Sequence, residues 1–327
     1  MAKRVSVDKW LFTSTLLLVF IGLVMVFSAS AVMAGERFGS PYYFLIRQLI
    51  WAVAGMGAMV VCMNIDYRKY KNQTLVYALL GITLGLLIAV FFLDRSHNTH
   101  RWIKFGVFSF QPSEMAKPAI ILFLAFWLET RIKTITDWKH TLMPAGIVTL
   151  LLTGLIVKQP DLGTGIACVA IAIAMLFVAG MEVKYIGYAF LASVPMLYWL
   201  LFRVAFRRKR MLAFLDPNAD PLGTGFHMIQ SLIAVSTGGI TGLGLMEGKQ
   251  KLFYLPEPQT DFIFAVTAEE LGLVGSIIVV VLFAIFLYRG IRAAVITEDT
   301  FGRLLATGIT AMVVVQAFFN VSVVLGL

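Results

Sequence analysis

The chain of 327 residues is 59% hydrophobic and only 14% charged. Its apolar runs are long enough to cross about 30 Å of hydrocarbon at about 1.5 Å per residue, so the composition indicates a polytopic membrane protein and excludes a soluble globular one. The net charge of +9 suits basic inner loops or an anionic lipid ligand. Because the sequence has no basic domain interleaved with aromatic residues, we expect no nucleic acid partner.

The first apolar run, residues 11–34, follows a basic N-terminal segment and is a candidate signal peptide or first membrane helix. The stretch Ala29-Ser30-Ala31 offers the small residues of a cleavage site. The run is too long for the apolar region of a signal peptide, however, and it predicts a retained first span.

Uncharged or nearly uncharged runs recur along the chain and predict membrane helices. Seven of them cover residues 11–34, 48–63, 74–93, 141–157, 162–181, 185–202 and 304–327. Two further runs, residues 112–128 and 262–288, each carry a pair of charged residues. Together they predict an all-α polytopic membrane protein with nine membrane helices in this chain.

A long segment, residues 203–260, separates the seventh and eighth predicted spans. With the N-terminus inside, the short inner segments carry more Lys and Arg than the short outer ones, which follows the positive-inside rule. Residues 203–260 then form a large extracytoplasmic loop. The basic cluster Arg207-Arg208-Lys209-Arg210 in this loop argues against that orientation.

Residues 222–246 within this loop contain no Asp, Glu, Lys or Arg and are a candidate tenth span. Their many glycines, with interspersed Ser and Thr, favour instead a surface or re-entrant segment packed on protein. If the segment crossed the membrane, Asp261 would lie on the opposite face.

Asp261 is the first candidate for a functional residue. It ends the proline-punctuated segment FYLPEPQTD, which begins at Phe253, and an apolar run follows directly. A carboxylate at membrane depth is costly and is therefore seldom without a function. The alternative is that Asp261 lies near the first turn of a helix and complements the helix dipole.

Further polar residues gather on the predicted outer side. Arg101 and Trp102 precede the segment QPSE, and Lys117 follows Glu114 by three residues, which places both on neighbouring faces of one helix. These residues are candidates for a paired site. Alternatively, Pro112 begins the helix, Glu114 suits its first turn and Lys117 extends outward to solvent.

The segment Lys158-Gln159-Pro160-Asp161 repeats this pattern at another span boundary. Here too, the alternative is that Asp161 is only the N-cap of the following helix. The sequence shows no Ser-His-Asp arrangement. Cys62 and Cys168 lie in apolar runs, where cysteine behaves as a small hydrophobic residue rather than as half of a metal pair.

Four segments carry a specific resemblance when they are taken together. They are QPSEMAKPA from Gln111, KQPDLGT from Lys158, FLDPNADPLGTGFHMIQS from Phe214 and KLFYLPEPQTDFIFAVTAEELG from Lys251. This combination resembles the SEDS family, the glycosyltransferases of shape, elongation, division and sporulation. The resemblance covers nearly the whole chain. The segments ASAVMAGERFGSPYYFLIRQLIW and KLFYLPEP are more similar to the division branch of the family than to its elongation branch.

The resemblance implies one SEDS-type domain over residues 1–327 that polymerises lipid II, an undecaprenyl-linked precursor, into peptidoglycan. It implies a place in the bacterial cytoplasmic membrane, at the division septum, with the reaction on the outer face. The implied partners are a class B penicillin-binding protein, other divisome proteins and membrane lipid. The family has ten spans, so the resemblance also implies that a final outer loop and helix are missing after Leu327.

Position by position, the essential acid of the family falls on Asp261. Its other cavity residues fall on Arg101, Trp102, Glu114, Lys117 and Asp161, and we add Lys158, Glu257 and Thr260 as candidates for the same cavity. The family's use of a divalent cation implies Mg²⁺ or Mn²⁺, although the sequence contains no ligand motif for either metal.

The implied reaction needs a base. Glycan growth requires a sugar hydroxyl to attack an anomeric carbon that carries a lipid diphosphate, with inversion from an α donor to a β(1→4) product. By analogy with inverting glycosidases, Asp261 is our candidate for the base that removes the hydroxyl proton. No covalent enzyme intermediate is required.

The leaving diphosphate needs positive charge, which Arg101, Lys117 or Lys158 would supply. Arg101 is the first choice because a guanidinium can grip phosphate with two hydrogen bonds. Glu114, and Asp161 from the next helix, would keep Lys117 protonated and aimed.

Two other classes of function stay open. Intramembrane acids and bases are also typical of proton-coupled carriers, so the chain is a candidate transporter, or flippase, of lipid-linked precursors. Against this, the sequence shows no internal repeat with paired broken helices. The third class is a scaffold that binds partner helices without catalysis.

Overall fold

The computed structural model describes residues 7–94, 101–105, 108–203, 205–223, 225–252 and 254–327. The chain divides into two compact units. Unit 1 comprises Met1–Met63, Phe190–Phe286 and Ala317–Leu327, and unit 2 comprises Asn64–Ala189 and Leu287–Gln316. The two last helices, α10 (Ile263–Ile296) and α11 (Thr300–Leu325), contribute residues to both units. Phe253 lies outside the described residues.

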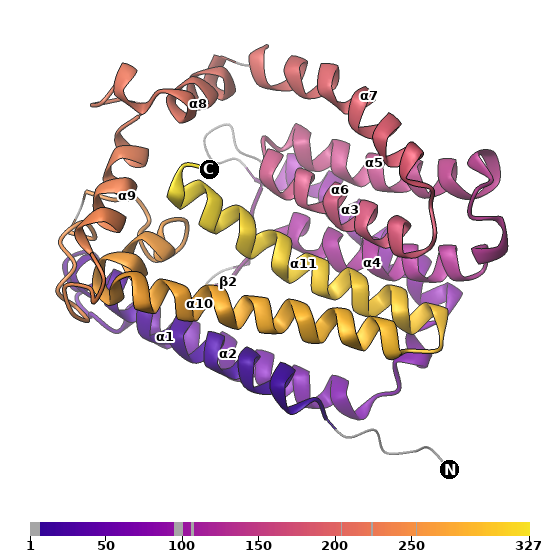
Figure 1. The fold of residues 1–327 in the computed structure, drawn as a ribbon, viewed down its shortest axis with the longest axis horizontal. Helices are drawn as coiled ribbons and strands as arrows, with labels where there is room; N and C mark the ends of the chain where they lie inside the picture. Colours follow the sequence, from indigo (N-terminus) through magenta and orange to yellow (C-terminus); the bar gives the residue numbers. More distant parts are fainter. Residues whose placement is uncertain (1–6, 95–100, 106–107, 204, 224, 253) are drawn as a thin grey trace. The chain divides into compact units, whose positions relative to one another are not determined.

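Unit 1 begins with two long helices, and α1 has a clear signal at each end. The elements are α1 (Lys9–Phe38), α2 (Tyr43–Asn64), α8 (Ala205–Leu215), η4 (Pro217–Ala219) and α9 (Phe226–Thr237) (Figure 1). Asp8 caps α1 by accepting hydrogen bonds from the backbone N–H groups of Trp10 and Leu11, both at 3.1 Å. Gly39 ends the helix in the left-handed conformation, at a φ of 71°.

α1 continues without a break through Ala29-Ser30-Ala31, the candidate cleavage site. These three residues are buried, and Ala29 belongs to an apolar cluster of unit 1 that also contains Phe264 and Val324. Small side chains let helices approach closely. Packing within unit 1 therefore accounts for the small residues of this stretch.

Unit 2 is built on four neighbouring helices, α3 (Gln73–Leu93), α4 (Pro112–Glu129), α5 (Met143–Lys158) and α6 (Leu162–Val178) (Figure 1). Between α3 and α4 in the chain is an antiparallel hairpin of β1 (Ile103–Phe105) and β2 (Phe108–Phe110). Short helical turns complete the unit: η1 (Tyr67–Tyr70), η2 (Ile132–Thr134) and the π-helical η3 (Trp138–Leu142). α7 (Val183–Phe202) begins in unit 2 and ends in unit 1.

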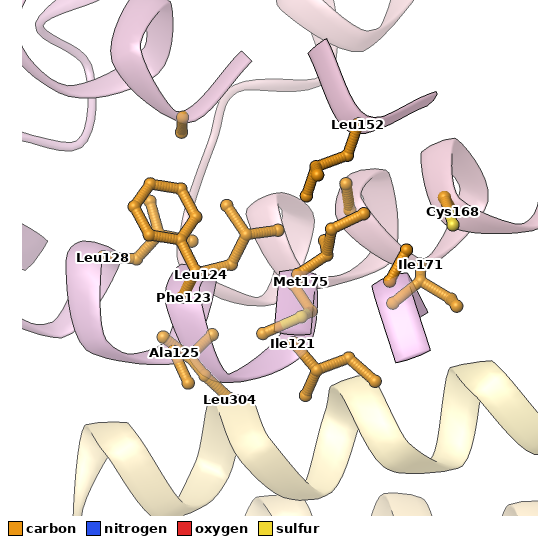
Figure 2. Close-up of a cluster of buried hydrophobic side chains, with 14 of the residues drawn as sticks. Ile121, Phe123, Leu124, Ala125, Leu128, Leu152, Cys168, Ile171, Met175 and Leu304 are labelled. Atoms are coloured by element: carbon orange, nitrogen blue, oxygen red, sulfur yellow. The ribbon is translucent and has the colours of Figure 1, made fainter. Parts of the chain in front are cut away.

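The core of unit 2 is a cluster of apolar side chains that fixes α4 against its neighbours (Figure 2). Its labelled members are Ile121, Phe123, Leu124, Ala125 and Leu128 of α4, Leu152 of α5, Cys168, Ile171 and Met175 of α6, and Leu304 of α11. Gly308 allows the close approach of α11, because a Cβ there would lie 2.6 Å from Ile121 Cγ2 and 2.8 Å from Met175 Sδ. This packing positions the ends of α4, α5 and α6 that carry the polar residues.

The predicted helical class is confirmed, because each of the nine predicted runs overlaps a helix. Six helical segments of the described chain are long and apolar enough to cross a membrane, namely α1, α2, α3, Trp138–Lys158, α10 and α11. The count of nine membrane helices stays a prediction, and so does the single domain. The β1–β2 hairpin is a departure from the expected all-α chain.

The stretch 222–246 does not form a membrane-spanning helix. Its helix, α9, has 12 residues, which at about 1.5 Å per residue reach about 18 Å, well short of about 30 Å of hydrocarbon. A glycine-rich loop follows α9. The expectation of a surface or re-entrant segment fits this structure, and the alternative of a tenth helical span does not.

α10 breaks at Gly272, where φ is 65° and ψ is −163°. The glycine-rich loop 238–244 fills the break. Two of its N–H groups donate to the carbonyls of residues 269–270, and the N–H groups of residues 273–274 donate to two of its carbonyls, at 2.9 to 3.2 Å. The backbone groups that the break frees are thus paired, as they must be where water is excluded.

Candidate functional site

The residues singled out from the sequence lie in both units. Unit 2 holds Arg101, Trp102, Glu114, Lys117, Lys158 and Asp161, and unit 1 holds Glu257, Thr260 and Asp261.

Lys117 is buried near the start of α4. Its side chain is 4% exposed, whereas that of Glu114 is 48% exposed, and its Nζ lies 2.8 Å from Glu114 Oε2. The same Nζ donates to Gln316 Oε1 of α11 at 2.8 Å. A buried ammonium needs such partners because an unpaired charge away from water is strongly unfavourable. The predicted Glu114–Lys117 pair is present, and the alternative in which Lys117 extends to solvent is wrong.

Asp161 joins the beginning of α6 to the beginning of α4. Its Oδ1 accepts a hydrogen bond from the backbone N–H of Thr164 at 3.2 Å, so it is the N-cap of α6. Its Oδ2 accepts from Gln111 Nε2 at 3.0 Å and from Ser113 Oγ at 3.4 Å. The capping role expected as an alternative is present. These neutral groups hold the carboxylate, so the expectation that it would aim Lys117 is not what the contacts show.

Arg101 is bound to the main chain where α5 ends and α6 begins. Its Nε donates to the carbonyl of Gln159 at 3.1 Å, and its Nη2 donates to the carbonyl of Pro160. The backbone N–H groups of Arg101 and Trp102 donate to the buried carboxylate of Asp94, at 2.9 and 3.1 Å. The Nε–Nη2 edge of the guanidinium is therefore already engaged, which leaves Nη1 for a ligand.

Lys158 is exposed at the C-terminal end of α5, with Nζ 5.6 Å from the ring centroid of Phe91. A cation over an aromatic face is stabilised without losing its solvent-facing hydrogen bonds. Of the two candidate lysines in unit 2, Lys158 is thus exposed and Lys117 is buried. Trp102 beside Arg101 is 42% exposed and adds an accessible aromatic surface.

Asp261 is exposed two residues before α10 begins at Ile263. The first turn of α10 itself holds no acidic residue, and Asp261 lies just before it, so the alternative of a helix-dipole role stays a prediction. Within the part of the chain that the structure describes, the Asp261 carboxylate has no hydrogen-bond or ion-pair partner. Its backbone carbonyl accepts from Asn320 Nδ2 of α11 at 3.1 Å. An anchored backbone with an uncommitted carboxylate is suited to a general base.

Glu257 and Thr260 form the turn before Asp261. The carbonyl of Glu257 accepts from the backbone N–H of Thr260 at 3.1 Å and from its Oγ1 at 3.3 Å. The Glu257 carboxylate accepts from Gln259 Nε2 at 2.8 Å. The φ of Glu257 is 45°, in a region that residues other than glycine seldom adopt. Such backbone strain is concentrated at functional sites, so the strain supports this turn as a candidate part of the site.

Sequence reasoning missed several residues that shape these two groups. Asp94, Gln111, Ser113 and Gln316 hold the polar residues of unit 2, and Asn320 holds the backbone of Asp261. Gln111 and Ser113 lie inside the segment QPSE, so their proximity in sequence was a usable signal. Nothing in the sequence around Gln316 and Asn320 indicates which residue each contacts.

Comparison with known proteins then identifies the family. The family model for cell cycle proteins of the FtsW, RodA and SpoVE type matches residues 8–327. This chain belongs to the SEDS family. The resemblance of the four sequence segments is therefore confirmed along nearly the whole length of this SEDS chain.

Relatives of this SEDS protein include members of the division branch. The probable peptidoglycan glycosyltransferase FtsW of Geobacter metallireducens is 44% identical over 309 residues, which cover 94% of this chain and 82% of that protein. Stage V sporulation protein E of Bacillus subtilis is 42% identical over 326 residues, which cover 99% of this chain and 89% of that protein. The predicted likeness to FtsW is confirmed.

Solved structures share the same SEDS fold. A chain of a peptidoglycan synthase complex that coordinates polymerization and crosslinking is 30% identical, with a TM-score of 0.77 over 98% of this chain and 88% of that chain. The rod shape determining protein RodA of Thermus thermophilus is 24% identical, with a TM-score of 0.68 over 97% of this chain and 84% of that chain. The second likeness supports the fold alone.

Proposed function

We propose that this multi-pass membrane protein is a peptidoglycan glycosyltransferase that polymerises lipid II into glycan strands during cell division. Relatives that are 41% to 44% identical bear the name probable peptidoglycan glycosyltransferase FtsW. The observation that carries the proposal is the exposed Asp261 carboxylate, which has no partner among the described residues. The backbone carbonyl of the same residue is anchored by Asn320.

Asp261 acts as the general base in this proposal. The acceptor sugar hydroxyl forms a new bond to the anomeric carbon of the donor, and its proton passes to the Asp261 carboxylate. The bond between the anomeric carbon and the lipid diphosphate breaks on the opposite side, which inverts the α configuration to β(1→4). The diphosphate leaves with the bonding electron pair. Solvent exposure of Asp261 allows the proton to be released afterwards.

The departing diphosphate needs positive charge, for which Lys117 and Lys158 are the candidate residues. Lys158 is exposed and has the reach of a flexible side chain, while Lys117 is fixed between Glu114 and Gln316. A fixed, buried cation is the more effective stabiliser of developing negative charge because it needs no reorganisation. We therefore assign the main role to Lys117, with Lys158 as a contributing cation. Arg101, whose Nε and Nη2 hold the main chain, keeps the α5–α6 junction in place.

The proposal includes a divalent cation, Mg²⁺ or Mn²⁺, that is bound jointly by the protein and the substrate. Within the described chain, no group of three or more His, Cys, Asp or Glu residues could hold a metal ion. Mg²⁺ is commonly bound by one or two carboxylates together with substrate phosphates, and the exposed carboxylate of Glu114, which lies next to Lys117, fits that donor set. The cation would neutralise charge on the diphosphate when it is bound.

A partner and a location are also part of this proposal. The synthase complex that shares this fold combines polymerization with crosslinking. Association with a class B penicillin-binding protein, the crosslinking enzyme, is therefore part of the proposal. So is recruitment to the division septum together with other divisome proteins.

A second candidate function is the transport of lipid-linked precursors, and one observation favours it. α10 is broken at Gly272, and broken helices are typical of the substrate sites of transporters. Reconstituted protein that moves lipid II across vesicles but forms no glycan would support this alternative. The elongation homologue RodA, which shares the fold, is the other alternative within the family.

The decisive experiment is a gel assay of lipid II polymerisation by the full-length protein with its partner. Asp261→Asn keeps the size of the side chain but removes the base, so glycan products should fall by about 10²–10⁴-fold. Glu247→Gln, an exposed carboxylate of the same unit, is the matched control and should polymerise normally. Normal polymerisation by Asp261→Asn would show that the base assignment is wrong.

A further inference from the structure

Two buried carboxylates lie in α10 immediately before its break. Glu269 and Glu270 are 0% and 1% exposed, and neither is used by the proposed reaction. Ionised groups at such depth are costly unless they are paired, so their partners indicate what they do.

Glu270 holds the polypeptide through three different groups. Its Oε1 lies 2.5 Å from Nζ of Lys251, which is itself only 5% exposed. Its Oε2 accepts a hydrogen bond from Ser28 Oγ of α1 at 2.5 Å and one from the backbone N–H of Met246 at 3.1 Å. Lys251 Nζ is also 3.2 Å from Ser28 Oγ, so the ammonium, the hydroxyl and the carboxylate form one closed network.

Glu269 binds backbone groups of the same stretch of chain. Its Oε1 accepts from the N–H groups of Lys249 and Gln250, at 2.8 and 3.1 Å. The side chain of Lys249 is exposed, so only its backbone takes part. Both carboxylates therefore bind residues 246–251, and the carbonyls of residues 269–270 bind the glycine-rich loop before it.

The network joins the two ends of the segment that carries Asp261, residues 251–270, and these joined ends are the base of the segment. Asp261 lies about midway along the chain between Lys251 and Glu270, whose side chains are in contact. Within the segment, the buried Leu255 packs in one cluster with Phe264, which leaves the turn before Asp261 little freedom. Closing a loop at its base reduces the number of conformations that its tip can adopt.

Stability alone gives a poor account of this arrangement. Replacing a buried ion pair by well-packed apolar side chains often leaves stability unchanged or higher. What the charged network adds is directionality, because the carboxylates accept from particular N–H groups of residues 246–251 and from the hydroxyl of Ser28. The geometry at the base of the segment is thereby specified.

We propose that Lys251, Glu269 and Glu270 are positioning residues that fix the segment bearing Asp261, so that its carboxylate meets the acceptor hydroxyl of lipid II. The inference rests on the proposed function in which Asp261 is the base. These three residues contact neither the substrate nor the reacting atoms. They act by reducing the freedom of Asp261.

The test uses the full-length protein with its partner and compares Lys251→Met, Glu270→Gln and the double variant Lys251→Met/Glu270→Gln. Each single variant leaves one buried charge without its counterion. We expect each to lower kcat for polymerisation by about 10–100-fold, since small displacements of a reacting group have effects of this size, with little change in the KM for lipid II. The double variant, which removes both charges, should recover most of the lost kcat.

A second measurement on the same variants does not depend on catalysis. The backbone N–H groups of Leu255 and Thr260 are hydrogen-bonded within the segment, at 3.0 and 3.1 Å. Their hydrogen exchange should be faster in the single variants and close to wild type in the double variant. Lys249→Met and Glu247→Gln, which change exposed side chains of the same loop, are matched controls for which kcat and exchange should not change.

The outcomes separate this inference from the proposed function. If Asp261→Asn stops polymerisation while Lys251→Met and Glu270→Gln keep wild-type kcat and exchange, the positioning role is wrong and the proposed base stands. If Asp261→Asn polymerises normally, the base assignment fails, and the positioning role fails with it. A fall in kcat that the double variant does not recover, with unchanged exchange at Leu255 and Thr260, would also overturn the positioning role.

Discussion

Lys117 and Glu114 form an ion pair of 2.8 Å in which the lysine is buried and the glutamate is half-exposed. The pair is therefore asymmetric. Removing the glutamate leaves a buried ammonium whose other partner is the neutral amide of Gln316, whereas removing the lysine leaves a carboxylate that water can solvate. Replacing Glu114 should therefore reduce stability more, and replacing Lys117 should reduce activity more.

We expect Glu114→Gln to lower the free energy of unfolding by about 1–3 kcal/mol, because it leaves a buried charge incompletely paired. Lys117→Met should change stability less, since it replaces the ammonium with an apolar side chain of similar length, but should lower polymerisation by about 10²–10³-fold. Thermal unfolding in detergent and the lipid II gel assay measure the two effects. Lys184→Met is the control: it breaks the Lys184–Glu182 pair, in which both side chains are about half-exposed, and should change stability little. Equal unfolding temperatures for Glu114→Gln and wild type would contradict the argument.

The break in α10 predicts strong sensitivity at two glycines. Gly272 has a φ of 65°, and a Cβ there would lie 2.3 Å from the backbone nitrogen of Gly242. A Cβ at Gly242 would lie 2.1 Å from the carbonyl oxygen of Glu270. Because both neighbours are backbone atoms, Gly272→Ala and Gly242→Ala should each destabilise the protein by about 2 kcal/mol or more.

Gly55→Ala is the matched control for these two substitutions. No atom lies within 4 Å of a Cβ at Gly55, which is inside α2, so alanine should be neutral or stabilise by up to about 1 kcal/mol. Thermal unfolding of the three variants in one detergent provides the comparison. A similar loss of stability at Gly55 and Gly272 would argue against a specific role for the helix break.

The helices of this protein could be predicted from sequence because long apolar runs have few other stable forms in a membrane. The same logic failed for the hairpin, since β1 and β2 are each only three residues long and leave no period to detect. The glycine content of residues 222–246 did predict a segment that is not a span. What it could not predict is the partner of those glycines, the break at Gly272, because that contact joins distant parts of the chain.

The site was predictable as a set of residues but not as a set of contacts. Glu114 and Lys117 are close in sequence, and their pairing follows from helical spacing. The guanidinium of Arg101 looked free to grip phosphate, yet two of its nitrogens hold main-chain carbonyls at residues 159–160. Long-range contacts of this kind depend on packing, which one sequence does not reveal.

Asp137 lies outside the membrane spans, and its lowered pKa predicts how stability depends on pH. A hydrogen bond with the His140 ring, 2.9 Å away, lowers the pKa of Asp137, and the backbone N–H groups of His140 and Lys139 contribute to the same effect. With the folded pKa below the ordinary value, the carboxylate stabilises the protein fully above that value, and this contribution is lost as the pH falls through the lowered pKa.

The unfolding temperature of wild type should therefore exceed that of Asp137→Asn at about pH 5, and the gap should shrink as the pH falls further. Thermal scans of both proteins from about pH 5 downwards measure this difference. A gap that widens on acidification would mean that the folded state binds the proton more tightly than the unfolded state, contrary to the lowered pKa.

Removal of divalent cations should affect the reaction and leave the substrate-free protein intact. Because no cluster of three potential ligands exists in the described chain, the cation is expected to bind only when substrate phosphates complete its coordination. EDTA should therefore stop polymerisation reversibly, with activity restored by Mg²⁺ or Mn²⁺, while the unfolding temperature without lipid II stays the same. With lipid II present, adding Mg²⁺ should raise the unfolding temperature, because a ligand that binds the folded state stabilises it. Unchanged polymerisation in EDTA would refute the cation requirement, and destabilisation of the substrate-free protein by EDTA would instead reveal a resident ion.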